Sequence, residues 1–463
     1  MTRRQARDQG FPLPAVLLST PIRRRLCGRP DRLLPCPSVP PALKILHCAD
    51  IHLGYETHGR LDPATGLNSR LLDFRRSFDA LVARALDENV DVFLFCGDAY
   101  RTADPTPTQQ KLFAEALRPV AEAGIPIVMI VGNHDHPVSF GKASSVDIFG
   151  VLDGRVDIFS TPTFRAAGQD GGPIQTASGP LQLIALPWPI RSKILSRQEH
   201  RGKTPHEIRD LIETLYTDFV QTCARDADPD LPLVVAAHLT VQGAELSGSE
   251  RSSLIAHEPT FTVGQLTPPP VDYVALGHIH RYQDRNLDAY TRGEGPPVVY
   301  SSSIERISFK EHDARKGFLL VDIEPGRTPR TRYEFVDTPA RVFLPLEIDA
   351  RGVSEPTEFI VAQIERRDVD DAVVRVRYQV DEESAGGVDA GRIRDALSGA
   401  SVVAAIEREV DAAERRKRTV VRRDTSLKDA MERYVDQHES LERIKGDLVA
   451  AALEIEQEVD AAS

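Results

Sequence analysis

From residue 43 onward, short apolar runs alternate with longer segments whose apolar residues recur every three or four positions. The short runs are typical of buried strands, and the longer repeats are typical of amphipathic helices. The first predicted strands are residues 43–48, 90–96 and 125–131. The helices between them are residues 68–89 and 106–123. This strand–helix–strand–helix–strand order predicts an α/β fold with a sheet flanked by helices.

The same alternation continues to about residue 325. Further apolar runs predict strands at residues 181–186, 233–237, 273–276, 298–300 and 318–323. Residues 204–222 are predicted to form one more helix. We therefore expect one large α/β domain over residues 43–325.

A change in composition after Pro325 separates this domain from a smaller one. Residues 341–405 alternate short strands with short helices. The predicted strands are residues 342–348 and 373–378, and the predicted helices are residues 355–367 and 390–397. This pattern predicts a small α+β domain over residues 341–405.

The end of the chain, residues 424–463, carries apolar side chains at spacings of three, four and seven, with charged residues between them. This pattern is typical of an amphipathic helix with one apolar seam. The seam residues are Leu427, Met431, Tyr434, Leu441, Ile444, Leu448, Ile455 and Val459. The seam could pack on its own domain or on another chain. We expect a partner chain, because the helix is terminal and follows a basic linker at residues 415–423.

Charge is distributed unevenly along the 463 residues, which carry a net charge of −12. Residues 1–42 contain eight arginines and two acidic residues, many prolines and no periodicity, so we expect a disordered basic extension there. A negative net charge is unusual for a nucleic-acid enzyme. It does not exclude one, because local basic surface can bind phosphates.

Neither a membrane span nor a disulfide framework is predicted. No apolar run reaches the roughly 18 residues needed to cross a bilayer. The five cysteines include no C-x-x-C pair, which favours a reducing compartment. We therefore expect a cytoplasmic protein.

Five short motifs supply a mixture of carboxylate, amide and imidazole groups, and most follow a predicted strand. Sites in open α/β sheets form outside the carboxyl ends of strands, so we expect these groups to converge. The candidate ligands are Asp50, His52, Asp98, Asn133, His238, His278 and His280. Such a set can hold two divalent cations that activate a water against phosphate esters. Mixed oxygen and imidazole donors favour Mn²⁺, with Fe²⁺ or Zn²⁺ possible.

His134 follows Asn133 but has no place in the seven-ligand set. Its imidazole could protonate a leaving oxygen or stabilise charge on the phosphorane, and we take it as the candidate catalytic residue. Asp135 could orient a nearby group or cap the following loop, and the sequence leaves both roles open. We expect His47 to be a packed strand residue.

At these motifs the chain resembles the calcineurin-like metallophosphoesterases and, among them, the SbcD-type nuclease subunits of the SbcCD complex. Three segments carry the closer resemblance: residues 46–54, residues 104–107 and the Tyr-Ser-Ser-Ser-Ile-Glu-Arg run at residues 300–306. In the last run, Ser301 and Ser302 stand where that family usually has Pro and Gly.

The resemblance implies a four-layer sandwich of two mixed sheets flanked by helices, with a small DNA-capping domain. It implies one metal held by Asp50, His52, Asp98 and His280. It implies a second held by Asp98, Asn133, His238 and His278, with His134 as the catalytic histidine. A homodimer and a C-terminal helix docked onto an SbcC-type ABC ATPase are also implied.

Our hypothesis is therefore a two-metal DNA nuclease. As the family implies, it would act as a 3′→5′ double-strand exonuclease and single-strand endonuclease in double-strand break repair and recombination, associated with the nucleoid. The main alternative is a small-molecule or cyclic-nucleotide phosphodiesterase. A protein phosphatase is disfavoured, because Asp135 stands where Glu is needed and no Asp-Arg-Gly follows Asp98. A scaffold without catalysis is disfavoured by the intact ligand set.

Overall fold

The computed structural model describes residues 42–137, 141–151, 155–190, 202–250, 258–324, 331–411 and 445–462. Nearly all of the predicted N-terminal extension and most of the seam at residues 424–444 therefore lie outside the described residues. Within the described ranges, no helix combines the length and apolar character that a membrane crossing requires.

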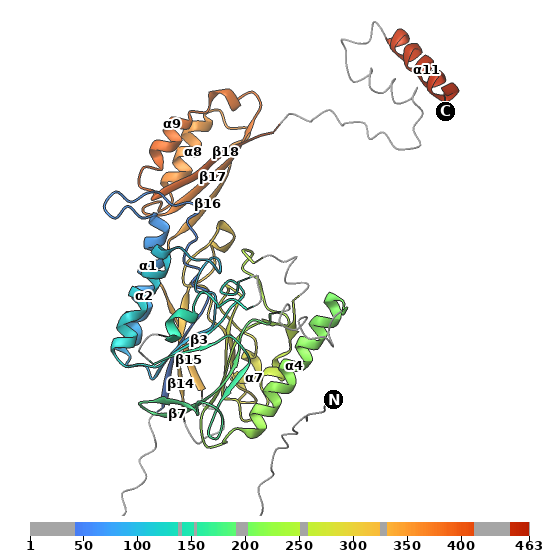
Figure 1. Ribbon diagram of the computed structural model, residues 1–463. Coiled ribbons are helices and arrows are strands. Elements are labelled where there is room, and N and C mark those ends of the chain that lie inside the picture. The colour runs from blue at the N-terminus through green and yellow to red at the C-terminus, as the bar shows by residue number, and fades with distance from the viewer. Residues whose placement is uncertain are drawn as a thin grey trace, which may run out of the picture. The chain divides into compact units, whose positions relative to one another are not determined.

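The first sheet has six strands in the order β15–β14–β1–β2–β3–β4. Figure 1 labels β3, β14 and β15 of this sheet. Its strands are β1 (Leu43–Cys48), β2 (Val92–Phe95), β3 (Ile127–Ile130), β4 (Val156–Phe159), β14 (Gly317–Ile323) and β15 (Thr331–Asp337). Strands β1 to β4 run parallel, and β14 and β15 are antiparallel additions at one side. The parallel crossovers contain α1 (Ser69–Asp87) and α2 (Pro107–Glu122).

The second sheet has seven strands, in the order β12–β13–β11–β8–β7–β5 with β6 paired to β7. Its strands are β5 (Thr163–Arg165), β6 (Ile174–Thr176), β7 (Gly179–Leu186), β8 (Leu233–His238), β11 (Tyr273–Gly277), β12 (Gln283–Asp284) and β13 (Val298–Tyr300). The four central strands β7, β8, β11 and β13 are parallel. The crossover from β7 to β8 contains α4 (Pro205–Asp226). Short elements β9 (Thr240–Val241), β10 (Thr260–Phe261), α6 (Val263–Leu266) and α7 (Leu287–Thr291) complete this half.

Strands buried on both faces hold the two sheets and their helices together. In β2, Val92 and Leu94 belong to the core between the sheets, whereas Phe93 and Phe95 belong to the core under α1 and α2. A third core joins α4 to the outer face of the second sheet. Because successive side chains of a strand point to opposite faces, a continuous apolar run suits such a central layer. The predicted four-layer sandwich is confirmed.

Local signals in the sequence begin the major helices. The side chains of Thr106 before α2 and Thr204 before α4 each accept a hydrogen bond from the backbone N–H three residues later. In turn, the side chains of Gln109 and Glu207 accept hydrogen bonds from the backbone N–H groups of Thr106 and Thr204. In both cases a proline follows the cap at the first helical position. These capping boxes satisfy backbone N–H groups that have no partner within the helix.

The small domain is a three-stranded parallel sheet with two helices. It contains β16 (Phe343–Asp349), α8 (Pro356–Glu365), β17 (Val373–Asp381), α9 (Ala390–Ala396) and β18 (Val402–Asp411). One face of the sheet packs on α8 and α9. The structure differs from the expected boundaries in two places: β15 continues the first sheet beyond residue 325, and β18 extends the small domain beyond residue 405. The last described element is α11 (Lys445–Ala462).

Arg341 connects the two domains through buried hydrogen bonds. Its backbone N–H donates to Glu305 at 2.9 Å, and its guanidinium donates to the Asp73 carboxylate on α1. The same guanidinium donates to the backbone oxygen of Asp371 in the small domain. Only 9% of Arg341 is exposed.

Candidate metal centre

The predicted ligands lie where parallel strands of both sheets end. Asp50 and His52 follow β1, Asp98 follows β2, and Asn133 follows β3 in the first sheet. In the second sheet His238 ends β8, and His278 and His280 follow β11. Since the carboxyl ends of parallel strands share one edge of a sheet, the two sheets bring all seven residues to a common cleft.

Four of these residues adopt left-handed backbone conformations. Their φ angles are 54° at Asp50, 51° at His52, 62° at Asp98 and 97° at His278. Asp and His tolerate this region better than most residues, and such conformations concentrate at functional sites. Hydrogen bonds between the loops hold them: the Asp50 N–H donates to the Gly97 oxygen at 2.9 Å, and the His52 N–H to the Asp98 oxygen at 3.0 Å.

Glycines before the ligands allow these loops to approach one another. A Cβ atom on Gly97, whose φ is +94°, would lie 2.3 Å from His238 Nδ1. A Cβ on Gly277 would lie 2.0 Å from the Cys96 oxygen. Any larger residue at either position would therefore push the ligand loops apart.

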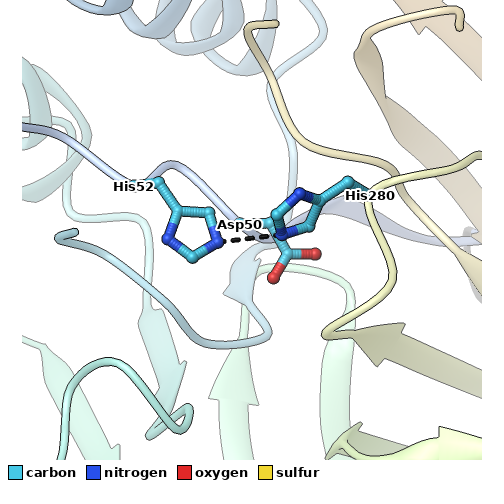
Figure 2. A group of neighbouring side chains, drawn as sticks. All are labelled: Asp50, His52 and His280. Atoms are coloured by element: carbon cyan, nitrogen blue, oxygen red, sulfur yellow. Dashed lines mark hydrogen bonds between the residues drawn. The ribbon is translucent and has the colours of Figure 1, made fainter. Parts of the chain in front are cut away.

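The first group of donors combines Asp50, His52 and His280 (Figure 2). The Nε2 atoms of His52 and His280 lie 2.9 Å apart, so at most one can carry a proton in that contact. The Oδ2 atom of Asp98 lies 3.5 Å from His52 Nε2 and 3.4 Å from His238 Nε2. Asp98 is therefore placed between the two groups of donors.

The second group centres on the Asn133 side-chain oxygen. This oxygen lies 2.9 Å from His238 Nε2 and 3.1 Å from His278 Nδ1. His238 Nδ1 donates to the Cys96 backbone oxygen at 2.7 Å. That bond selects the tautomer whose Nε2 lone pair faces Asn133 and Asp98, as a metal ligand requires.

Two carboxylates that the sequence analysis missed orient two of the candidate ligand histidines. His278 Nε2 donates to Glu258 at 3.0 Å, and His280 Nδ1 donates to Glu311 at 3.1 Å. Carboxylates in this position fix the orientation of a metal-bound imidazole and increase its basicity. Neither glutamate follows a predicted strand or shares a motif with a ligand, so no sequence signal marked it.

Glu311 also belongs to a buried ion pair with Lys316. Its Oε2 lies 3.0 Å from Lys316 Nζ, and the exposed fractions of the two residues are 0% and 2%. Burial raises the pKa of Glu311, but the charges of Lys316 and His280 outweigh it and hold that pKa well below its ordinary value. Lys316 Nζ donates further to the His280 backbone oxygen and to Ser303.

The serine loop at residues 301–303 supports the same histidine. Ser302 has a φ of 76°, a conformation that favours glycine. Its hydroxyl oxygen lies 2.9 Å from both the His280 and the Arg315 backbone oxygens, so its single proton can be donated to either. Either bond holds a non-glycine residue in the left-handed conformation.

Asp135 joins the ligand loops through their backbones. Its carboxylate accepts from the N–H groups of Asp98, Ala99 and Gly132 at 2.8–2.9 Å. Burial and the nearby Asp98 charge raise its pKa to about 6, although the backbone donors oppose that shift. The structure therefore favours the orienting role among the two that the sequence left open.

The buried His47 lies within the core, and its Nδ1 atom forms a hydrogen bond with Tyr273 OH at 2.9 Å.

His134 lies at the edge of the centre. Its Nδ1 donates to the Arg101 backbone oxygen at 2.7 Å, and its N–H donates to Asp98 Oδ1 at 2.8 Å. Its ring centroid is 4.7 Å from that of His52, and one of its ring nitrogens lies within 4.8 Å of possible ligand atoms of Asp98 and His52. With Nδ1 donating to a carbonyl, Nε2 is the atom available for proton transfer.

Four of the predicted ligands, Asp98, Asn133, His278 and His280, line a cleft of about 550 Å³ together with Tyr55, Arg101 and His134. Trp188, which follows β7, packs beside the cleft with its ring centroid 4.9 Å from that of His278. Sequence analysis did not single out this tryptophan, although its place just after a strand was a usable signal.

The donor set fits two divalent cations. Burial raises the pKa of Asp50, whereas at Asp98 the imidazoles of His238 and His134 outweigh burial and hold the pKa well below normal. Two buried carboxylates and converging imidazole nitrogens need positive charge between them. Carboxylate, amide and imidazole are ligands for Mn²⁺, Fe²⁺ or Zn²⁺.

Comparisons with known proteins agree with this geometry. A family model described as "Calcineurin-like phosphoesterase" matches residues 43–282. The D subunit of nuclease SbcCD from Bacillus subtilis (strain 168) is 29% identical over 288 residues, covering 61% of this chain and 67% of that protein. The protein of the same name from Escherichia coli (strain K12) is 25% identical over 290 residues, covering 62% and 66%.

The matched region spans about two thirds of the length of these relatives. Among solved structures, a dimetal phosphatase from Danio rerio shares 9% identity over 64% of this chain and 99% of that chain, with a TM-score of 0.33. The family model covers more than half of the chain and spans every one of the seven converging residues. The chain is a metal-dependent phosphoesterase that belongs to the calcineurin-like phosphoesterase family.

Proposed function

We propose that this protein is a two-metal DNA nuclease that hydrolyses phosphodiesters at DNA ends. The observation that carries the proposal is the convergence of seven ligand side chains into two donor groups joined by Asp98. The similarity to two nuclease subunits over 288 and 290 residues supports DNA as the substrate.

One cation would be held by Asp50, His52, Asp98 and His280. The other would be held by Asp98, Asn133, His238 and His278. Mn²⁺ suits this mixture, and Fe²⁺ or Zn²⁺ would also be accepted. When bound, the cations would activate a water and neutralise the charge on the phosphate oxygens.

The chain itself would orient the ligands and transfer a proton. Asp98, placed between the donor groups, would hold both cations at a fixed separation. His134, fixed through Nδ1 by the Arg101 oxygen, would protonate the leaving oxygen from Nε2. Glu258 and Glu311 would keep His278 and His280 in the ligand tautomer.

The proposed function also includes DNA, an ATPase partner and a role in break repair. We infer that the small domain over β16–β18 caps the DNA and that the C-terminal helical segment docks onto an SbcC-type ATPase. The wild-type protein would form a homodimer and act in break repair and recombination at the nucleoid. The similarity to subunits of a complex named SbcCD supports the ATPase partner.

A comparison of substrates tests this proposal. Purified protein should degrade linear DNA in Mn²⁺, should lose that activity in EDTA and should regain it when Mn²⁺ is restored. Cyclic nucleotides should be turned over far more slowly than linear DNA at matched concentrations. Efficient cyclic-nucleotide hydrolysis without any cleavage of DNA would instead support a small-molecule phosphodiesterase.

Replacing His134 with asparagine should lower kcat on DNA by about 10²–10³-fold, because a positioned proton donor is lost. The effect should be smaller on bis-p-nitrophenyl phosphate, since nitrophenolate leaves without a proton. Manganese stoichiometry, measured by equilibrium dialysis, should stay at the wild-type value. The same change at the exposed His206 on α4 provides the matched control. Loss of metal from the His134→Asn protein would make His134 a ligand instead.

A further inference from the structure

Arg101 stands at the mouth of the cleft on a firmly held stretch of backbone. It follows Asp98 by three residues, and its N–H donates to the Leu53 oxygen at 3.1 Å. Its own carbonyl oxygen accepts from His134 Nδ1 at 2.7 Å. The position of Arg101 is thus fixed relative to both a ligand loop and the candidate proton donor.

The Arg101 side chain extends over an aromatic ring instead of pairing with a carboxylate. Its guanidinium carbon lies 5.0 Å from the centroid of the Tyr55 ring, and both residues line the cleft. Among the described residues, no carboxylate lies within ion-pair distance of it. By contrast, Arg292 pairs with Glu294 at 2.8 Å and Arg315 pairs with Asp337 at 2.5 Å.

An exposed guanidinium without a carboxylate partner is suited to an anionic ligand. Its planar donors match two phosphate oxygens at once, and stacking on a ring holds it in place before the ligand arrives. The described cleft lining also includes Asp104, Glu250 and Glu258, so Arg101 contributes positive charge among carboxylates. A phosphate drawn to Arg101 would lie beside His134, at the leaving-group side of the centre.

We propose that Arg101, stacked over Tyr55, binds a phosphate next to the scissile one and so makes the site select polynucleotides over isolated esters. This inference rests on the proposed nuclease function and deepens it. The cations would neutralise only the reacting phosphate, whereas a polynucleotide brings a neighbouring phosphate that needs its own counter-charge. A simple diester has no such group and gains nothing from Arg101.

The test compares Arg101→Gln and Arg101→Lys with the wild-type protein. KM and kcat are measured in Mn²⁺ on a single-stranded oligonucleotide and on bis-p-nitrophenyl phosphate. We expect Arg101→Gln to raise KM for the oligonucleotide about tenfold more than KM for the small diester, because a charge-assisted bond is lost only with DNA. The slope of log KM against the logarithm of the salt concentration should become shallower by about 0.7, which is the contribution of one phosphate contact on a single strand. Arg101→Lys should restore the salt slope but only part of the affinity.

Arg118→Gln is the matched control, because Arg118 is an exposed arginine on α2 with a carboxylate partner, Glu122. It should leave both substrates and the salt slope unchanged. Equal changes in KM for the two substrates, or an unaltered salt slope in Arg101→Gln, would overturn the inference and leave the nuclease function standing. A wild-type protein that hydrolyses the small diester but never cleaves DNA would overturn both.

Discussion

Replacing Asp98 with asparagine is expected to lower metal-dependent phosphodiesterase activity by at least ~10³-fold, equivalent to ~4 kcal/mol of transition-state stabilisation. Asp98 Oδ2 lies about equally far from His52 and His238, so one carboxylate serves both donor groups. Without its charge the centre should retain one cation at most. Asparagine also tolerates the φ of 62° at this position, so the loop should keep its shape.

The measurement pairs initial rates on linear DNA with manganese stoichiometry from equilibrium dialysis. The side-chain oxygen of the introduced asparagine can still accept the His134 N–H bond that Asp98 Oδ1 accepts, so the melting temperature should stay within a few degrees of wild type. The same change at the exposed Asp79 on α1 is the control for a lost surface charge. A variant with two bound cations and more than a tenth of the wild-type rate would refute the bridging role.

Replacing Lys316 with methionine should destabilise the protein by about 3–5 kcal/mol, the usual cost of leaving a buried charge without its partner. Glu311 would keep its hydrogen bonds to Ser249 and to the Ile307 N–H but would lose the ammonium group that balances its charge. The His280 backbone oxygen would lose one donor as well. Urea unfolding at neutral pH, followed by circular dichroism, measures the change.

The double variant Glu311→Gln, Lys316→Met separates the ion pair from packing. It should recover part of the lost stability, because no uncompensated charge remains in the core. Its manganese affinity should nevertheless fall, since glutamine orients His280 less strongly than a carboxylate does. If Lys316→Met alone costs less than about 1 kcal/mol, Glu311 is not charged in the folded protein.

The sandwich was predictable because its strongest signals are local. The run at residues 90–96 is largely apolar, and the structure buries β2 on both faces. Thr106 and Thr204 mark the helix starts through capping boxes. The convergence of the candidate ligands was predictable for the same reason, because most of them are polar residues directly after a strand.

Features that depend on distant contacts were not predictable. Glu258 and Glu311 acquire their roles only when folding brings them against His278 and His280, and neither lies in a motif. Strand β15 alternates more and less exposed positions at the edge of the first sheet, so its apolar signal is weak. The left-handed conformations of the ligand loops likewise arise from bonds between loops, which spacing along the chain cannot show.

Arg341 has a consequence for anyone who divides this protein into pieces. A nuclease fragment cut at the end of β15 would keep the Asp73 and Glu305 carboxylates but would lose Arg341, which donates hydrogen bonds to both. Asp73 would still have Arg70 at 2.6 Å, but the buried guanidinium of Arg341 would be gone. A shortened chain that ends beyond β18 would therefore keep all the hydrogen bonds of Arg341, those to Asp73 and Glu305 and the one to Asp371.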